Sequence, residues 1–204
     1  MVQDVVPARV DRDQLRAQIE GKYTEVALDP QQGFHFHTGR RLASMLGYSD
    51  SEVDALPATT VESFAGTGNP FSLGPIQIGE TVLDIGCGAG FDTLIAALQV
   101  GASGNVIGLD MTQAMVEKTR QGANQLGLKN VEVRLGYAEE LPVDSGSVDV
   151  VISNGVINLC PDKQQVMREV WRVLRPGGRA QIADIVVHKE VPQDARDDID
   201  LWSG

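Results

Sequence analysis

The stretch Thr81-Val82-Leu83-Asp84-Ile85-Gly86-Cys87-Gly88-Ala89-Gly90 decides the fold, because an apolar run leads directly into a glycine turn. The run has the character of a buried strand, and residues 91–98 after the turn have helical character. A strand, a glycine turn and a helix in this order are typical of a doubly wound sheet that binds a nucleotide-like ligand. Glycines suit such a turn because a side chain would block close approach of the backbone to the ligand.

Strands and helices alternate regularly after this turn. Further strands are predicted at 105–110, 131–135, 148–153 and 180–187, with helices at 113–126 and 162–174. The strand at 131–135 alternates apolar and polar residues, which favours an edge or exposed position. Five strand units at this spacing predict an α/β fold with a parallel, doubly wound, Rossmann-like sheet.

The first third of the chain is predicted to be helical. Helices are expected over 12–25, around Leu42, and after Ser49, whose spacing from Glu52 is that of a capping box. Residues 61–79 are turn-rich and are either a plain linker or a ligand-facing loop. We therefore divide the chain into a helical cap and loop, residues 1–79, and a core, residues 80–204. The cap is expected to cover the ends of the strands.

The composition and net charge of the chain limit the classes of substrate and partner that it can bind. The 204 residues carry a formal net charge of −11, with 42% hydrophobic and 22% charged residues. Such an acidic surface repels phosphate backbones and anionic lipid, so we expect a small-molecule substrate and neither nucleic acid nor membrane. Cys87 and Cys160 are far apart and form no CxxC pair, which favours the cytoplasm and buried thiols and argues against a disulfide or metal site.

The glycine spacing and two aspartates separate the candidate cofactors. A dinucleotide fingerprint needs a third glycine where this chain has Phe91. Asp84, just before the turn, would repel a pyrophosphate and attract a cation. S-adenosylmethionine offers an ammonium and a sulfonium and has no phosphate. Asp110, at the end of the next strand, is the expected partner of the ribose hydroxyls. We therefore expect S-adenosylmethionine as the cofactor.

Several segments together carry a family resemblance: residues 83–90, 108–112, 138–142, 153–159, 174–178 and the loop 66–70. The first, with 108–111 and 174–178, resembles the class I S-adenosylmethionine-dependent methyltransferases. The wider set looks most like the arsenite methyltransferase branch. The resemblance implies that Gly86, Gly88 and Asp84 serve the methionine end, and that Asp110 holds the ribose.

The same resemblance implies the rest of the site. Met111 would pack on the adenine, Ala138 and Glu139 would meet its edge, and residues 154–157 would line the methyl-donor side. Asn154 is the candidate positioning residue for the reaction. The predicted cofactor-binding residues are Asp84, Gly86, Cys87, Gly88, Asp110, Met111, Ala138, Glu139, Asn154 and Val156.

The departures from the arsenite branch concern its thiols, which suit soft trivalent arsenic. Two cysteines of that branch correspond to Thr67 and Gly155 of this chain. An early pair of its cysteines falls near His35 and His37, and a later cysteine would come just after Gly204. These four positions, Thr67, Gly155, His35 and His37, are the predicted substrate pocket. A packed aromatic hairpin is the other interpretation of the two histidines, and a metal site is a weaker one because they have no third ligand. They and Asp184 are also candidate bases if the acceptor is a hydroxyl or carbon acid.

Family members are similar in having seven strands, whereas five are predicted here. The strand at 180–187 is then an exposed edge, unless the chain is truncated or the edge pairs with the cap or with a second copy in a homodimer. Three functions stay open. We favour methyl transfer to an unidentified small molecule over arsenite methylation and over a catalytically silent cofactor-binding protein.

Overall fold

The computed structural model describes residues 10–30, 32, 37–189, 191–198 and 201–202. Within these residues the centre of the fold is one five-stranded, fully parallel sheet with the strand order β3-β2-β1-β4-β5. The strands are β1 (Thr81–Ile85), β2 (Asn105–Asp110), β3 (Val131–Leu135), β4 (Val148–Asn154) and β5 (Leu174–Ala183). The predicted fold class is confirmed, and β3 lies at an edge as its alternating pattern indicated.

The order of the strands places a crevice beside β1. The chain proceeds outwards from β1 to β2 and β3, and then returns to the other side of β1 as β4. At the ends of these strands Ile85 lies in register with Leu109 on one side and with Ser153 on the other. Connections therefore diverge above β1 and β4, which is the point at which open α/β sheets bind ligands.

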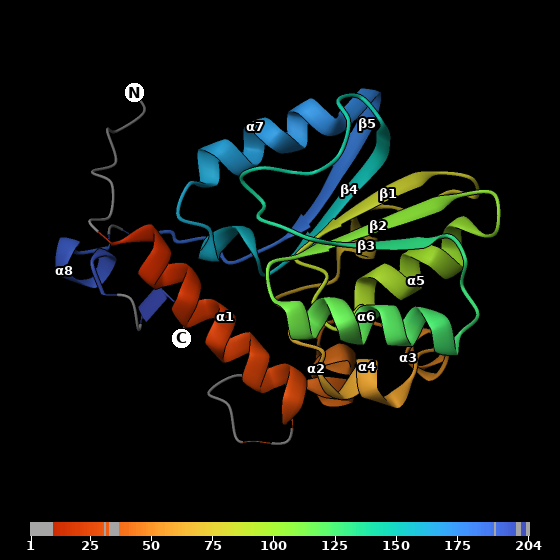
Figure 1. The fold of residues 1–204 in the computed structure, drawn as a ribbon, viewed down its shortest axis with the longest axis horizontal. Helices are drawn as coiled ribbons and strands as arrows, with labels where there is room; N and C mark the ends of the chain where they lie inside the picture. The colour runs from red at the N-terminus through yellow and green to blue at the C-terminus, as the bar shows by residue number, and fades with distance from the viewer. Residues whose placement is uncertain (1–9, 31, 33–36, 190, 199–200, 203–204) are drawn as a thin grey trace.

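Helices cover both faces of the sheet (Figure 1). α7 (Lys163–Val173) packs Val166, Val170 and Val173 against one face, together with Leu83 and Val151 of the central strands. α5 (Phe91–Val100) and α6 (Gln113–Gln125) lie on the opposite face. Both faces of β1 and β4 are thus removed from water, which explains why β4 is buried at all seven positions.

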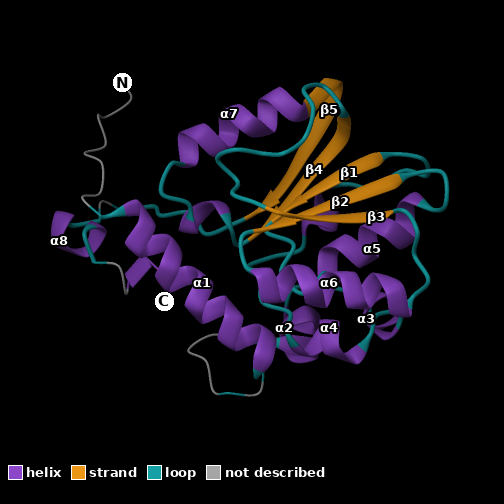
Figure 2. Ribbon diagram, in the orientation of Figure 1, coloured by secondary structure: helices purple, strands orange, loops and turns teal. Residues whose placement is uncertain are grey.

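The N-terminal helices are α1 (Arg12–Leu28), α2 (Gly39–Met45), α3 (Asp50–Asp54) and α4 (Ala58–Glu62). Of these, α1 packs beside α6 and crosses the carboxyl ends of the strands, whereas α2 to α4 pack below α5 and α6 (Figure 2). Lys118 of α6 donates to the carbonyl oxygen of Ala27 at 2.7 Å and to Ser63 Oγ at 2.6 Å. The capping box of Ser49 and Glu52 is present at the start of α3.

Several short helices lie outside the predicted pattern. α4 and the 3-10 helix η1 (Pro70–Leu73) fall at the start of, or within, the stretch predicted as irregular, and η2 (Ile157–Leu159) follows β4. Segments of three to five residues are too short to show a helical period, so periodicity could not find them. A four-residue helix, α8 (Gln193–Arg196), follows β5.

The fifth strand differs from its prediction. It was expected over 180–187, but β5 ends at Ala183, which pairs with the last residue of β4, Asn154. The ladder between β4 and β5 ends at this pair, and residues 185–187 beyond it are apolar and exposed. Among the described residues, no helix combines the length and apolar composition that crossing a membrane requires.

Candidate functional site

The glycine turn after β1 has the backbone conformation that only glycine adopts readily. Gly86, Gly88 and Gly90 have φ angles of +75°, +52° and +91°. A Cβ atom on Gly86 would approach Val156 Cγ2 to 2.2 Å, so the turn packs directly against the loop after β4. A Cβ atom on Gly88 would meet no atom within 4 Å. The turn therefore leaves open space above Gly88.

A cavity of about 1000 Å³, counting its open mouth, occupies this space at the carboxyl ends of β1, β2 and β4. All of the predicted cofactor-binding residues line it: Asp84, Gly86, Cys87, Gly88, Asp110, Met111, Ala138, Glu139, Asn154 and Val156. The helical cap contributes Arg16, Ile19 and Tyr23 from α1, and the following loop contributes Ser63, Phe64 and Ala65. Part of the stretch predicted as linker or loop thus faces the cavity.

Buried carboxylates form the floor. Asp84 is 1% exposed and accepts a hydrogen bond from Thr93 Oγ1 at 2.6 Å. Burial, and then the charge of Asp92, raise the pKa of Asp84 to about 8. Burial also raises the pKa of Asp92 to about 6, although Tyr48 and Asn154 donate to it. The pKa of Asp110 is raised by burial as well.

The backbone fixes the orientation of Asp110. Its Oδ2 accepts from the Gly88 N–H at 2.9 Å and its Oδ1 from the Thr112 N–H at 2.8 Å. The carboxylate thereby ties the end of β2 to the glycine turn. Among the described residues that line the cavity, Arg16 is the one basic side chain, against the carboxylates of Asp84, Asp92, Asp110 and Glu139. The cavity is therefore electrostatically suited to a cationic ligand.

Asn154 connects the floor to the loop 66–70. Its Oδ1 accepts from the N–H groups of Thr67 at 2.8 Å and Gly68 at 3.1 Å. Its Nδ2 donates to the Gly68 carbonyl oxygen at 2.8 Å and to Asp92 Oδ2 at 3.0 Å. The amide is 8% exposed and fully occupied by protein partners. Asn154 is thus placed to position other groups rather than to contact an acceptor itself.

Tyr48 and Asp92 were missed by sequence reasoning. Tyr48 is buried between α2 and α3, and its hydroxyl donates to Asp92 Oδ1 at 2.6 Å. Burial and the Asp92 charge raise the pKa of Tyr48, so it stays a neutral donor. Asp92 lies in the first turn of α5 directly after the glycine turn, and that position was a usable signal. Nothing in the local sequence links Tyr48 to a residue 44 positions away.

The predicted substrate-pocket residues do not all meet. Gly155 lines the cavity with a φ of +71°, and a Cβ atom there would lie 3.1 Å from Thr67 Cγ2. Thr67 is adjacent but does not line the cavity; its hydroxyl donates to the carbonyl oxygen of Ala183 at 3.2 Å. His37 is exposed before α2 and is not among the residues that line this cavity. His35 lies outside the described residues.

The two cysteines are buried, as expected. Burial, and then the charge of Asp110, raise the pKa of the Cys87 thiol, and burial and the Glu139 charge raise that of Cys160 to about 12. Neither is a thiolate at neutral pH. Among the described residues, no group of three or more His, Cys, Asp or Glu side chains is arranged to hold a metal ion.

Comparison with known protein families identifies the family to which the sheet and the glycine turn belong. Residues 76–203 match a family model described as a methyltransferase domain, which is more than half of the chain. The chain belongs to the class I S-adenosylmethionine-dependent methyltransferases. The family match covers the sheet and the glycine turn, and α1, which forms one wall of the cavity, lies outside it.

Similar proteins include arsenite methyltransferases. One from Halobacterium salinarum is 46% identical over 159 residues, which are 78% of this chain and 40% of that protein. A crystal structure of an arsenic(III) S-adenosylmethionine methyltransferase from Chlamydomonas reinhardtii is 37% identical with a TM-score of 0.66, covering 71% of this chain and 51% of that one. A demethylmenaquinone methyltransferase from Listeria welshimeri is 40% identical over 110 residues, 53% of this chain and 46% of that protein.

These relatives agree on the fold and differ in the acceptor that their names state. The chain spans about two fifths of the length of the arsenite methyltransferase from Halobacterium salinarum. The matched family model covers the sheet and the glycine turn, and the identity of the acceptor is a separate question.

Proposed function

We propose that this chain binds S-adenosylmethionine in the cavity above the glycine turn and transfers its methyl group to a small-molecule acceptor. The observation that carries the proposal is the combination of open space above Gly88 with the buried carboxylates of Asp84, Asp92 and Asp110. A ligand with an ammonium and a sulfonium group and no phosphate fits that charge pattern.

Each predicted residue has a role in this proposal. Asp84 and Asp92 attract the cationic methionine end, and Gly86 and Gly88 let it approach the backbone. Asp110, held by two N–H donors, offers its carboxylate to the ribose. Met111 and Ala138 supply apolar surface for the base, and Glu139 supplies an acceptor for its edge. Cys87 and Val156 complete the wall around the turn.

The bound cofactor supplies an activated methyl group, which an acceptor lone pair takes by in-line displacement. The protein has to align the two reactants and exclude water. Asn154 contributes by holding the loop 66–70 and the carboxylate of Asp92 in fixed positions. α1 covers the cavity with Ile19 and Tyr23, which keeps water from the reacting atoms. A protein nucleophile is not required.

Arsenite is the second candidate acceptor, favoured by the similarity to arsenite methyltransferases. The chemistry of this chain argues against it. Thr67 and Gly155 lie side by side where that branch has cysteines, and Cys160 has a pKa of about 12. Soft trivalent arsenic needs thiolates. We therefore place a different small molecule first, with Thr67, Gly155 and the two histidines His35 and His37 as the acceptor-side residues to test.

Titration calorimetry with S-adenosylmethionine and S-adenosylhomocysteine tests the proposal. Binding of both is expected, and replacement of Asp110 by Ala should weaken it at least tenfold because a charged hydrogen-bond acceptor is lost. Asp144→Asn removes one negative charge at an exposed position outside the cavity and should leave affinity unchanged. Absence of binding to the wild-type chain would overturn the proposal. Binding without turnover on any acceptor, including arsenite with a thiol, would indicate a silent cofactor-binding protein.

We also propose the wider organisation expected from the sequence. Residues 1–79 form a cap and residues 80–204 the cofactor-binding core, supported by the packing of α1 and α4 on α6. The absence of a CxxC pair and the burial of both thiols support a place in the cytoplasm. The net charge of −11 argues against a nucleic-acid partner. The exposed side of β5 is where a homodimer would form.

A further inference from the structure

Two polar atoms in the cavity wall are buried without any hydrogen-bond partner in the protein: Nε of Arg16 and Oε1 of Glu139. Both side chains line the cavity, Arg16 from α1 and Glu139 from the loop after β3. They are neighbours, since an outer guanidinium nitrogen of Arg16 lies 3.5 Å from Glu139 Oε2. The pair therefore offers one donor and one acceptor that the protein itself leaves unused.

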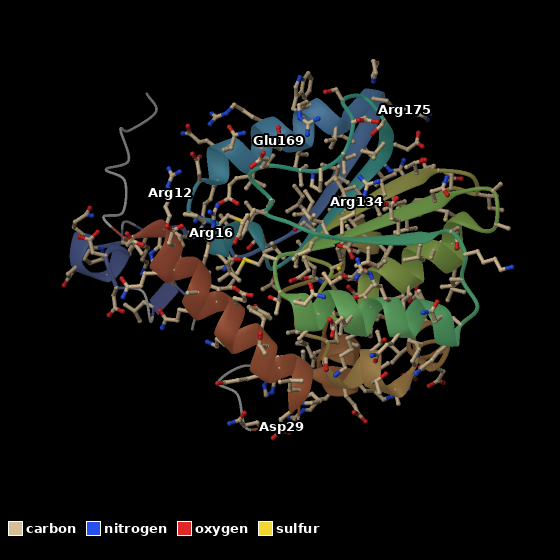
Figure 3. The ribbon with its side chains drawn as sticks, viewed as in Figure 1. Arg12, Arg16, Asp29, Arg134, Glu169 and Arg175 are labelled. Carbon is tan, nitrogen blue, oxygen red and sulfur yellow. The ribbon has the colours of Figure 1, made fainter. Side chains whose placement is uncertain are left out.

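The position of Arg16 is fixed by its surroundings. Its guanidinium carbon lies 4.1 Å from the centre of the Tyr137 ring, which is a cation–π contact. Its side chain is 24% exposed, whereas that of Arg12, one turn earlier on α1, is 64% exposed and pairs with Asp162. Figure 3 shows both arginines at the N-terminal half of α1. Arg16 is thus a wall residue of the cavity, and Arg12 is a surface residue.

Leaving one polar atom of each of these charged groups buried without a hydrogen bond costs free energy, and such atoms normally have a partner. A ligand edge that places an acceptor beside a donor would satisfy both atoms. The amino group and adjacent ring nitrogen of adenine form such an edge. In hypoxanthine the pattern is reversed, since a carbonyl oxygen and an N–H group stand at the same two places.

We propose that Arg16 is a specificity-determining residue that, together with Glu139, selects the adenine base of the cofactor. The proposal rests on the proposed function and adds to it a residue of the cap, outside the matched methyltransferase domain at 76–203. Arg16 also joins α1 to the loop after β3 through Tyr137 and Glu139, so the cap takes part in recognition of the base and does more than cover it.

The test compares S-adenosylhomocysteine with S-inosylhomocysteine, its analogue with a carbonyl oxygen in place of the 6-amino group, by calorimetry. The wild-type chain should prefer the adenine compound by about tenfold or more, the value of one hydrogen bond to a charged group. Arg16→Ala should lower affinity for the adenine compound by a similar factor and bring the ratio of the two affinities towards one. The matched control is Arg12→Ala, which should change neither affinity.

Glu139→Gln provides an independent variant, because its amide can donate to the carbonyl oxygen of the inosine compound. This variant should bind the inosine compound relatively better than the wild type does. If Arg16→Ala weakens both ligands equally, or Glu139→Gln leaves the ratio unchanged, Arg16 only holds α1 in place and the inference is wrong. If the wild-type chain binds neither compound, the proposed function itself fails. Thermal unfolding of each variant establishes that it is folded.

Discussion

Gly88 is the residue at which the backbone of the glycine turn meets the cavity. Its N–H group donates to Asp110, and no atom would contact a Cβ placed there. Gly146, in the loop before β4, has a comparable φ of +64° and equally open surroundings, but it does not line the cavity. The two glycines therefore share their conformation and differ in what occupies the space beside them.

Replacing Gly88 by Ala should abolish or strongly weaken cofactor binding, because the methyl group would enter the space proposed for the ligand. Gly146→Ala carries the same backbone cost, about 1–2 kcal/mol for a left-handed non-glycine residue, without touching the cavity. The midpoint temperature of thermal unfolding should fall by a similar amount in both variants. Calorimetry should show weakened cofactor binding only in the Gly88→Ala variant. Equal cofactor affinity in the two variants would contradict the proposed position of the ligand.

Asp84 and Asp92 make ligand binding depend on pH. Their pKa values are raised to about 8 and about 6, so both hold protons in the free protein over part of the physiological range. A cationic ligand favours the ionised carboxylates and lowers these pKa values, so binding releases protons. Affinity should therefore rise with pH between about 6 and 8.

Calorimetry in buffers with different enthalpies of ionisation measures this proton release directly. Asp84→Asn should remove the part of the pH dependence nearest pH 8 and weaken binding. A ligand affinity that does not depend on pH would argue against a cation bound beside these carboxylates.

The same raised pKa values also predict the stability of the free protein. Its free energy of unfolding should fall as the pH rises from about 4 to about 8, because the folded state binds more protons than the unfolded state there.

At the scale of elements, the loop 66–70 is held by the end of β4 rather than by its own sequence. Asn154 contributes four hydrogen bonds to this loop and to Asp92, while the loop carbonyl and amide groups have no regular strand to pair with. Gly66 and Gly68 permit close contact, since a Cβ on Gly66 would approach Asn154 Nδ2 to 2.7 Å. The loop is therefore ordered by one buried amide.

Asn154→Ala should release this loop and leave the carboxylate of Asp92 with one donor fewer. The expected loss of stability is about 2–4 kcal/mol, since several buried partners become unsatisfied. Hydrogen exchange at the Thr67 and Gly68 amides should accelerate, and turnover should fall more than cofactor affinity. Asn124→Ala, on the exposed face of α6, is the control and should change none of these. Unchanged exchange at Thr67 would show that other contacts hold the loop.

At the scale of the whole molecule, β5 lies at the edge of the sheet, and no further strand of the described residues pairs with its outer side. Ile185, Val186 and Val187 follow it and are 58%, 70% and 63% exposed. Unpaired strand edges next to exposed apolar residues favour association with another chain. This is the physical basis for the proposed homodimer.

Sedimentation velocity over a range of protein concentrations tests the homodimer. Self-association is expected for the wild-type chain, and Val186→Asp should shift it towards monomer because a charge is placed in the contact. Met167→Asp introduces the same charge at an exposed apolar position on α7 and should have no effect. A monomer at all concentrations would contradict the homodimer proposal without affecting the proposed methyl transfer.

The sequence by itself determined the sheet and many of the residues that line the cavity. Local signals suffice there: the run from Thr81 to Gly90 is contiguous, Asp110 ends the next strand, and parallel strands bring their carboxyl ends to one edge. The end of β5 was wrong because strand length depends on the partner strand, and β4 stops at Asn154. The place of His37 outside the lining of the cavity could not be predicted from the sequence, since nothing local fixes how the cap lies on the core.

Only the tertiary structure decided what the cap contributes. Tyr48 and Asp92 are 44 residues apart, and Arg16 and Glu139 are 123 apart, yet the members of each pair contact each other, and Asp92, Arg16 and Glu139 line the cavity. These contacts depend on how α1 to α4 pack on the core, and that packing is determined by apolar burial spread over many residues rather than by any motif. The sequence thus specifies where the cofactor is expected, and the packing of the cap decides which further side chains surround it.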